Sequence, residues 1–273
     1  MSDKDCKIND VSSKMSKRLI TNAEMLRVSG DMKSFRTVAD IGCDHGYVSI
    51  YLVQQKIADR AIAMDVRKGP LSGALSNIRE FGLSEVITAR LSDGLKELEP
   101  GEADAAIIAG MGGKLMIRIL EDKDPCGLGI KEAVLQPQSD LDEFRRYIRN
   151  KGYTIASERI ILDEGKYYFP MRVVFSKNGV PDSKGRIHDY VHEACTIIMD
   201  KSGCSQETAI SICDRFGEHN ILNRDELLRD YLKHGIDVSK SILQHLSESG
   251  HKQRQNELSK ELSEMEAALM IFR

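Results

Sequence analysis

The segment best suited to chemistry is the loop Asp40-Ile41-Gly42-Cys43-Asp44-His45-Gly46, which joins an expected strand to an expected helix. Glycines in such a turn allow a tight bend and let the backbone approach a ligand closely. The dinucleotide pattern GxGxxG is absent, because the glycine after Gly42 comes only four residues later. Asp40 and Asp44 would repel a pyrophosphate, but they would attract a sulfonium ligand that also carries an ammonium group. The loop therefore predicts S-adenosylmethionine rather than NAD.

Three further segments stand at the carboxyl ends of the next expected strands. Asp65 ends the second strand, 25 residues after Asp40, where an acidic side chain can bind both ribose hydroxyls. The third strand leads into Ser92-Asp93-Gly94-Leu95, where an acid can accept the exocyclic amine of adenine. The fourth leads into the glycine cluster Gly110-Met111-Gly112-Gly113, at a point where ligands bind to such sheets. Each segment alone is typical of an ordinary turn, but four in succession predict one cofactor site.

The elements that must position these residues alternate between short apolar runs and helical stretches. Expected strands are 37–42, 61–66, 86–91, 105–110 and 132–137, and expected helices are 46–56, 69–82, 113–122 and 139–151. Strands that are apolar on both faces and separated by helices predict a parallel sheet covered on both sides. A further helix is expected from Ser16, as its N-cap, to about Val28.

The pattern changes after Gly152. The runs 153–162 and 167–175 flank the turn sequence Asp163-Glu164-Gly165-Lys166 and predict an antiparallel hairpin. Five parallel strands closed by a hairpin are typical of class I methyltransferases and unlike the all-parallel sheet of dehydrogenases. We therefore expect an α/β, Rossmann-like fold with a mostly parallel seven-stranded sheet and an antiparallel C-terminal hairpin.

A second, helical domain is expected after the linker-like stretch 176–186. One or two helices are expected over 188–216. Two apolar stripes at alternating spacings of three and four predict an antiparallel helical hairpin with coiled-coil-like packing. Its stripes are Leu228, Tyr231, Gly235, Val238 and Ile242, and then Leu258, Leu262, Met265, Leu269 and Phe272. The predicted domains are 1–178, which binds S-adenosylmethionine and includes the N-terminal helix, and 186–273.

The overall composition narrows the class of protein. The 273 residues are 41% hydrophobic and 30% charged, which is typical of a globular protein. No secretory signal and no run of roughly 18 apolar residues is seen, so a cytoplasmic protein without a membrane partner is expected. The six cysteines form no CxxC pair, which favours free thiols and argues against a metal site. The net charge of −3 neither predicts nor excludes a nucleic-acid partner.

Five segments together resemble a known family. They are SKRL (16–19), DIGCDHGY (40–47), SDGL (92–95), IAGMGG (108–113) and LQPQ (135–138). In these motifs the chain resembles the bacterial tRNA (adenine-22-N1)-methyltransferases of the TrmK type, over most of its length. The resemblance implies a class I enzyme that transfers a methyl group from S-adenosylmethionine to N1 of adenine 22 in tRNA. The wider superfamily usually has glycine where Asp44 stands, whereas the resembling family shares this aspartate.

The acceptor that the resemblance implies determines what the site must do. Adenine N1 carries a free lone pair at neutral pH, so the enzyme must unpair, hold and align the base rather than deprotonate it. Carboxylates or carbonyl oxygens near the base would stabilise the positive charge that develops. We expect Asp44 and Gln136, in the turn Gln136-Pro137-Gln138, to serve as catalytic residues on the acceptor side, although a purely structural turn is the alternative for Gln136.

The remaining expected roles concern the cofactor and the RNA. The expected cofactor-binding residues are Arg18, Asp40, Gly42, Cys43, Asp44, His45, Tyr47, Asp65, Val66, Asp93, Gly94, Leu95, Gly110, Met111 and Gly112. His45 either contacts the amino-acid end of the cofactor or caps the helix, and Tyr47 either stacks or packs in the core. The expected RNA-phosphate contacts are Lys17, Arg145, Arg146 and Arg149, for which a solvated helix face is the alternative.

Two other functions remain open at this level. A methyltransferase for another RNA base or a small molecule would keep the cofactor residues and differ only in its acceptor surface. A non-catalytic RNA-binding or protein-binding module would use the sheet as a scaffold, which the intact set Asp40, Asp65 and Asp93 argues against. The oligomeric state, monomer or weak dimer, is also open.

Overall fold

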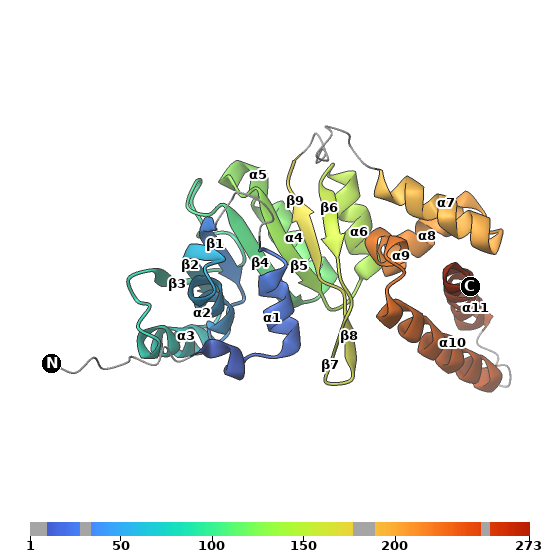
Figure 1. Ribbon diagram of the computed structural model, residues 1–273, viewed down its shortest axis with the longest axis horizontal. Helices are drawn as coiled ribbons and strands as arrows, with labels where there is room; N and C mark the ends of the chain where they lie inside the picture. Colours follow the sequence, from blue (N-terminus) through green and yellow to red (C-terminus); the bar gives the residue numbers. More distant parts are fainter. Residues whose placement is uncertain (1–9, 28–33, 177–188, 247–251) are drawn as a thin grey trace.

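A seven-stranded sheet lies at the centre of residues 10–176, which we call the sheet part (Figure 1). The computed structural model describes residues 10–27, 34–176, 189–246 and 252–273. The strand order is β3-β2-β1-β4-β5-β9-β6. The first five strands are β1 (Phe35–Ile41), β2 (Ala58–Asp65), β3 (Ile87–Leu91), β4 (Ala105–Met111) and β5 (Glu132–Pro137). All neighbours among these five pair in parallel, as the alternating pattern predicted.

Helices cover both faces of the sheet, because its strands are apolar on both sides. One face carries η1 (Val11–Lys14), α1 (Lys17–Glu24), α2 (Tyr47–Gln54) and α3 (Lys68–Glu80). The other carries α4 (Gly113–Asp122), α5 (Pro125–Leu128) and α6 (Leu141–Asn150). Neighbouring residues of β1 point to opposite cores, Val38 toward α2 and Ala39 toward α4. Ser16 caps α1 as expected, since its hydroxyl accepts a hydrogen bond from the backbone of Leu19.

The expected C-terminal hairpin is present but is divided into two pieces. In the sheet, β9 (Met171–Val174) pairs antiparallel with both β5 and β6 (Thr154–Glu158). Beyond them, β7 (Ile161–Asp163) and β8 (Lys166–Tyr168) form a separate two-stranded ribbon that turns at Glu164 and Gly165. The ribbon projects past the edge of the sheet and reaches α1 (Figure 1). This fold is the predicted Rossmann-like, mostly parallel sheet with an antiparallel end.

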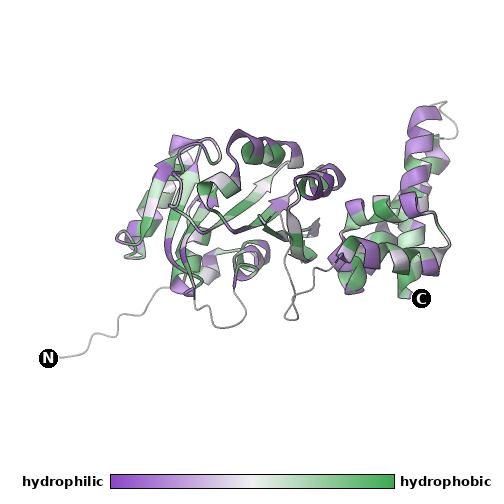
Figure 2. Cartoon of the chain, turned by 90° about the horizontal axis from the view of Figure 1, so that it is seen from above, coloured by the Kyte–Doolittle hydropathy of each residue, from purple (hydrophilic) through white to green (hydrophobic). Residues whose placement is uncertain are grey.

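Residues 189–246 and 252–273, which we call the helical part, pack beside the sheet part around a third apolar core, to which Ile160 and Phe169 of the sheet part also contribute (Figure 2). The helices are α7 (Tyr190–Ser202), α8 (Gln206–Phe216), α9 (Glu218–Leu222), α10 (Glu226–Leu246), α11 (Lys252–Leu269) and η2 (Met270–Phe272). The two helices expected over 188–216 are α7 and α8. The linker-like stretch falls mostly on 177–188, outside the described residues, so the domain boundaries stay a prediction.

Helices α10 and α11 form the expected helical hairpin, but part of the expected stripe on α10 is wrong. The buried residues of α10 are Leu228, Leu232, Ile236 and Ser239, whereas Val238 and Ile242 are about two-fifths exposed. Their spacings of four, four and three average about 3.7 residues per turn, close to the roughly 3.6 of a straight α-helix, so the buried stripe runs along one side of a straight helix. The two helices approach closely at Gly235, where a Cβ would lie 2.7 Å from the Met265 sulfur.

Buried charges join the sheet part to the helical part. Arg145 of α6 is completely buried, donates to the Glu158 carboxylate at 2.7 Å, and donates to the Asp214 and Arg215 carbonyls at 2.8 Å. Gly217 lies so close to Glu158 that any side chain there would overlap the carboxylate, and its φ of +87° also favours glycine. The junction thus depends on an arginine held between two units of the fold.

None of the described helices combines the length and the apolar character that a membrane span requires.

Candidate cofactor and acceptor site

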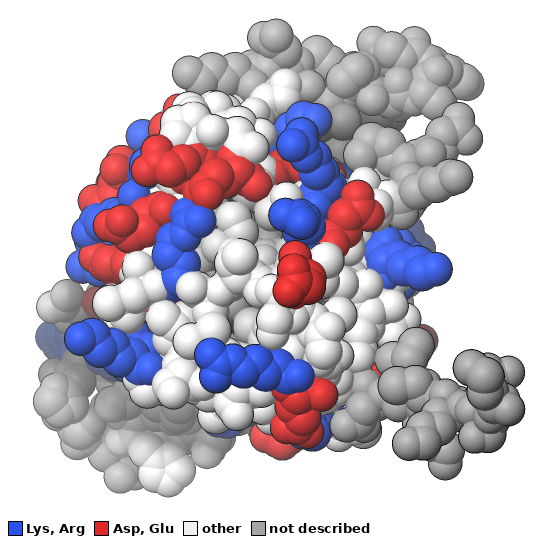
Figure 3. All heavy atoms as spheres, turned by 90° about the vertical axis from the view of Figure 1, so that its left-hand side faces the viewer, with Lys and Arg blue, Asp and Glu red and all other residues white. Residues whose placement is uncertain are grey.

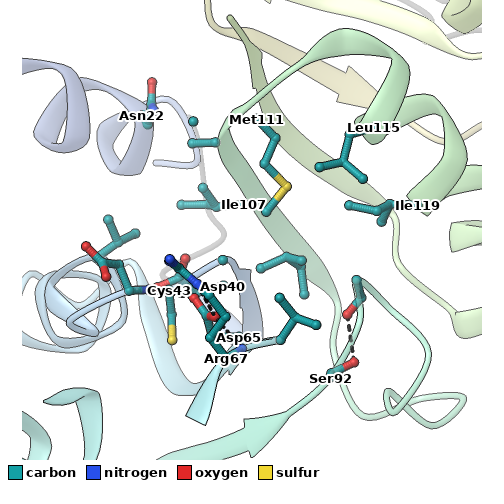
Figure 4. Close-up of a pocket in the computed structure, with 18 of the residues that line it drawn as sticks. Asn22, Asp40, Cys43, Asp65, Arg67, Ser92, Ile107, Met111, Leu115 and Ile119 are labelled. Atoms are coloured by element: carbon teal, nitrogen blue, oxygen red, sulfur yellow. Dashed lines mark hydrogen bonds and ion pairs between the residues drawn. The ribbon is translucent and has the colours of Figure 1, made fainter. Parts of the chain in front are cut away.

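A cavity of about 590 Å³ opens at the carboxyl ends of β1, β2, β3 and β4, and we call it the cofactor cavity. β1 and β4 are neighbours in the sheet although β2 and β3 lie between them in the chain, so their following loops diverge and leave a cleft. Figure 4 shows Asp40, Cys43 and Asp65 together on one side, with Met111, Leu115 and Ile119 across from them. The structure therefore brings the predicted segments into one site.

The loop after β1 is held against β2 and bends as its glycines predict. The backbone amides of Gly42 and Cys43 both donate to the Met64 carbonyl, at 2.7 and 3.0 Å. Gly42 has φ of +78°, and a Cβ there would lie 2.5 Å from the Met111 methyl group. Asp44 also has a positive φ, of 47°. The left-handed conformation favours glycine, and aspartate is one of the few other residues that adopt it.

Asp65 is placed for a bidentate contact with neighbouring hydroxyls. Its carboxylate is 5% exposed and accepts the backbone amides of Arg67 at 2.8 Å and Asp44 at 3.4 Å. These bonds fix the carboxylate at the tip of β2, while the cavity leaves it accessible on one side. The Arg67 guanidinium lies 3.7 Å away and is largely exposed. Asp65 thus links the loop after β1 to the loop after β2.

Asp40 is a buried acid at the floor of the cavity. One of its oxygens accepts the Ser49 hydroxyl at 2.7 Å and the Ser49 backbone amide at 3.1 Å. Burial raises the pKa of Asp40 to about 6, against the opposing effect of the Ser49 hydrogen bonds. A cationic ligand group in the cavity would favour the ionised form and recover this cost.

Cys43 lines the cavity but is unsuited to act as a nucleophile. Burial raises the pKa of its thiol, and the nearby carboxylates of Asp40, Asp65 and Asp44 raise it further. A protonated thiol is a poor nucleophile. Cys43 therefore contributes packing and backbone to the loop.

The opposite side of the cavity combines an apolar wall with an acid. Leu115, Ile119 and the exposed Val66 present aliphatic surface of the kind that a purine ring requires. Asp93 stands at the edge of this wall, and a 2.5 Å hydrogen bond from Lys96 lowers its pKa. Asp93 thus remains ionised, and its other oxygen lies 4.0 Å from the Arg118 guanidinium.

Arg18 lines the cavity on the side of β5 and the β7–β8 ribbon. Its guanidinium donates to the Gln136 side chain at 2.8 Å, and its backbone amide donates to Asp163 at 3.1 Å. The guanidinium also lies over the Tyr168 ring, 5.1 Å from the centroid. A Cβ on Gly110 would lie 3.9 Å from both Arg18 and Gln138, so these two side chains flank the glycine loop. The ribbon β7–β8 and strand β5 therefore fix one cation at the mouth.

Most of the predicted cofactor residues line the cavity, but Leu95 and Gly112 do not, and neither does Gln136, which was predicted as catalytic. Leu95 packs completely within the core of the sheet part, because its side chain points away from the loop. Gly112 begins α4 and lies next to Ser139. Gln136 is fully buried, and its amide donates to the Pro137 carbonyl at 3.2 Å while its oxygen holds Arg18. The prediction that the Gln136 side chain contacts the acceptor directly is therefore wrong.

Two residues with alternative roles also line the cavity. His45 does not cap α2, since that helix begins after Gly46 without a side-chain cap. Its ring instead lies at the cavity, 5.8 Å from the Tyr47 ring. Tyr47 lines the cavity and also packs partly against the core, so its position is compatible with both stacking and core packing.

The predicted RNA contacts on α6 need correction. Arg145 is completely buried in the junction, which excludes any contact with a phosphate. Arg149 is paired with Asp214 and Glu218, two carboxylates that are themselves buried. Helical periodicity turns these two arginines toward the helical part, and the sequence alone does not show that a second unit packs there. Arg146 is about half exposed, and Lys17 is exposed on α1.

Sequence reasoning missed three polar residues that line the cavity, Asn22, Arg67 and Arg118. Asn22 is completely buried, and both polar atoms of its amide are without a partner among the described residues. Arg67 follows Asp65 by two positions, so its place in the loop directly after β2 could have predicted that it lines the cavity. Asn22 and Arg118 reach the site only through the packing of α1 and α4, which no local sequence pattern indicates.

Comparison with known proteins agrees with this geometry. Residues 15–171 match the family model described as a methyltransferase domain. The chain is 37% identical over 155 residues to the tRNA (adenine(22)-N(1))-methyltransferase of Bacillus subtilis, covering 57% of this chain and 63% of that enzyme. It is 33% identical over 159 residues to a putative tRNA methyltransferase of Mycoplasma pneumoniae, covering 58% of this chain and 70% of that protein.

A solved structure extends the similarity beyond the sheet part. The crystal structure of the B. subtilis m1A22 tRNA methyltransferase TrmK superposes with a TM-score of 0.72 at 25% identity. The superposition covers 93% of this chain and 98% of that one, so the helical part is included. The resemblance found in the motifs is thereby confirmed. The chain belongs to the family of proteins with a methyltransferase domain.

Proposed function

We propose that this protein transfers the methyl group of S-adenosylmethionine to N1 of adenine 22 in tRNA. The observation that carries the proposal is the placement of Asp40, Asp44 and Asp65 around one cavity at the carboxyl ends of β1 and β2. The family match supports methyl transfer, and the name of the B. subtilis relative supports the substrate. A tRNA substrate would locate this reaction in the cytoplasm.

The residues of the cavity fit S-adenosylmethionine, which would supply an activated methyl group on a sulfonium. Asp65 would bind the ribose hydroxyls, since its carboxylate is fixed by two backbone amides and open to the cavity. Val66, Leu115 and Ile119 would enclose the adenine ring, with Asp93 at its amine. Asp40 and Asp44 would face the positively charged end of the ligand. A pyrophosphate, by contrast, would meet these carboxylates unfavourably.

The acceptor side must orient a base and exclude water rather than remove a proton, because adenine N1 is already unprotonated at neutral pH. Arg18 and Gln138 flank the glycine loop after β4 and can hold the incoming nucleotide. Gln136 acts one step further back, as a positioning residue that holds the Arg18 guanidinium. Asp44, more than half exposed at the mouth, would stabilise the positive charge on the methylated base.

The RNA backbone is proposed to contact the edge of the molecule around the cavity mouth. Lys17 remains as an exposed cation for a phosphate, and the half-exposed Arg146 would exchange its ion pairs with Asp142 and Asp214 for such a contact. On the face seen in Figure 3, acidic side chains lie among the basic ones, so that face is less suited to a polyanion. The modest total charge of −3 is consistent with a local contact surface rather than a generally basic protein.

The decisive experiment incubates the purified protein with methyl-labelled S-adenosylmethionine and unmodified tRNA, followed by mapping of the label. We expect N1-methyladenine at position 22 and no label in a transcript with guanine at that position. Transfer to another nucleotide would support a different RNA base as the target. Cofactor binding without any transfer to tRNA would point to a small-molecule acceptor, and absence of cofactor binding would refute the enzyme assignment.

A further inference from the structure

A second cavity, of about 410 Å³, adjoins the cofactor cavity and has a different chemical character. We call it the aromatic cavity, and its lining includes Gln138, Lys166, Tyr167, Tyr168, Phe169 and Tyr231. These residues come from the turn after β5, from the ribbon strand β8 and its continuation, and from α10. Gln138 lines both cavities, so the two adjoin at that residue.

Aromatic side chains are concentrated here far beyond their frequency in the chain. The 273 residues include only seven Phe and eight Tyr, with no Trp, yet four of these fifteen rings line this one cavity. The Tyr231 ring makes edge contacts with Tyr167 and Phe169, at centroid distances of 5.1 and 5.3 Å. Phe169 is buried, whereas Tyr167 and Tyr168 are only half-buried. The rings thus pack against one another, while Tyr167 and Tyr168 remain partly exposed.

The boundary between the two cavities is built from groups that suit a nucleotide. Arg18 lines the cofactor cavity while its guanidinium lies over the Tyr168 ring. Gln138 stands beside it, and its backbone amide donates to the Met111 carbonyl at 2.8 Å, which fixes the turn. Lys166 is exposed at the rim of the aromatic cavity. In a nucleotide complex the cation suits the phosphate and the amide suits the edge of the base. The aromatic faces suit the plane of the base.

We propose that the aromatic cavity binds, by stacking on Tyr167, a nucleobase adjacent to the target adenine of the RNA substrate. This inference rests on the proposed function. A single-stranded nucleotide chain that places one base in the cofactor cavity must continue past Arg18 and Gln138, which leads its neighbour into the aromatic cavity. Stacking of this kind tolerates any base, because every base has a π-face. The neighbouring nucleotide thereby helps to keep the target adenine out of its helix.

The test uses tRNA that carries 2-aminopurine at the nucleotide on either side of the target adenine. Emission of 2-aminopurine falls when the base stacks on an aromatic ring, and the chain has no Trp to interfere. Because 2-aminopurine is already quenched by base stacking in free tRNA, the two complexes are compared: for one of the flanking positions we expect emission to be several-fold lower in the wild-type complex than in the Tyr167→Leu complex. In Tyr167→Leu, emission should be restored and tRNA affinity reduced by about tenfold, the scale of one lost base–aromatic stack.

Matched variants separate stacking from packing. Tyr167→Phe keeps the ring and should behave as wild type, while Tyr147→Leu makes the same change on α6 and should leave quenching intact. Thermal melting of each variant reports whether the fold is retained. Equal emission from the wild-type and Tyr167→Leu complexes at both flanking positions would overturn the inference. Failure of the wild type to bind tRNA, seen as unchanged anisotropy, is instead a failure of the proposed function.

Discussion

The Arg145 guanidinium lies 2.7 Å from the Glu158 carboxylate with both side chains essentially excluded from solvent. Two backbone carbonyls of the helical part accept hydrogen bonds from its Nη1 atom, so the pair connects α6, β6 and α8. Breaking a buried pair from one side leaves an uncompensated charge, whereas removing both charges does not. This relationship makes Arg145 a structural residue of the junction rather than an RNA contact.

Arg145→Met should therefore lower the free energy of unfolding by about 3–5 kcal/mol, as measured by urea denaturation. Arg145→Met combined with Glu158→Gln should recover part of that loss, because a neutral amide leaves no unpaired buried charge. Arg146→Met is the matched control at the next position, where an exposed pair contributes at most about 1 kcal/mol. Equal losses for Arg145→Met and Arg146→Met would contradict the assignment.

Gln136→Leu should disorder the Arg18 guanidinium, because it removes the acceptor 2.8 Å away. A hydrogen bond to a charged group contributes roughly 1.5–3 kcal/mol, so kcat/KM on tRNA should fall about tenfold or more. Gln136→Glu keeps an acceptor oxygen and should restore part of the activity. Cofactor affinity, measured by calorimetry, should remain unchanged. A loss of cofactor affinity would show that Gln136 supports cofactor binding rather than the acceptor side.

Asp65→Ala should weaken binding of S-adenosylmethionine without unfolding the protein, since it removes the proposed acceptor of both ribose hydroxyls. Two charge-assisted hydrogen bonds correspond to a loss of roughly a hundredfold in affinity. Asp59→Ala is a suitable control, because Asp59 is an exposed acid nearer the start of the same strand. The prediction fails if calorimetry gives the same dissociation constant for Asp65→Ala as for the wild type.

Asp40 should make both stability and cofactor binding depend on pH. Its pKa is about 6 in the folded protein and 3.8 in the reference state, so the folded chain holds the proton more tightly. This contribution to stability is fully present below about pH 4 and is lost as the pH rises through 6. Asp40→Asn should therefore gain stability relative to the wild type between pH 4 and 7 in parallel urea titrations.

Cofactor affinity should show the opposite trend, because a cationic ligand favours the ionised carboxylate. Wild-type affinity should increase between pH 5 and 7, and Asp40→Asn should flatten that increase. A wild-type profile that is flat over this range would mean that no positive ligand group approaches Asp40.

Lys17→Glu should reduce tRNA affinity and lower the dependence of log affinity on log salt by about one unit. Lys131→Glu is the control, since Lys131 is exposed before β5 begins, at the edge of the sheet opposite the cavity. A filter-binding series at several salt concentrations measures both effects. If the two reversals act equally, the contact surface does not lie at the cavity mouth.

The sequence by itself determined the parallel sheet and the site at its carboxyl edge. Strand and helix periodicity are local properties, and the carboxyl ends of neighbouring parallel strands meet at one edge whatever the details of packing. The positions of Asp40, Asp65 and Asp93 in the cavity follow from that rule. Likewise, the sequence shows Asp44 in the first loop where the dinucleotide pattern would have a glycine nearby, and this acid predicts a positively charged ligand.

Only the tertiary structure decided which polar residues face solvent, ligand or another part of the fold. Arg145 and Arg146 are adjacent arginines on one helix, yet Arg145 is buried in the junction and Arg146 is exposed. Gln136 and Gln138 flank one proline, yet one is buried behind Arg18 and the other lines both cavities. These differences arise from contacts between segments far apart in the chain, which local pattern and composition do not encode.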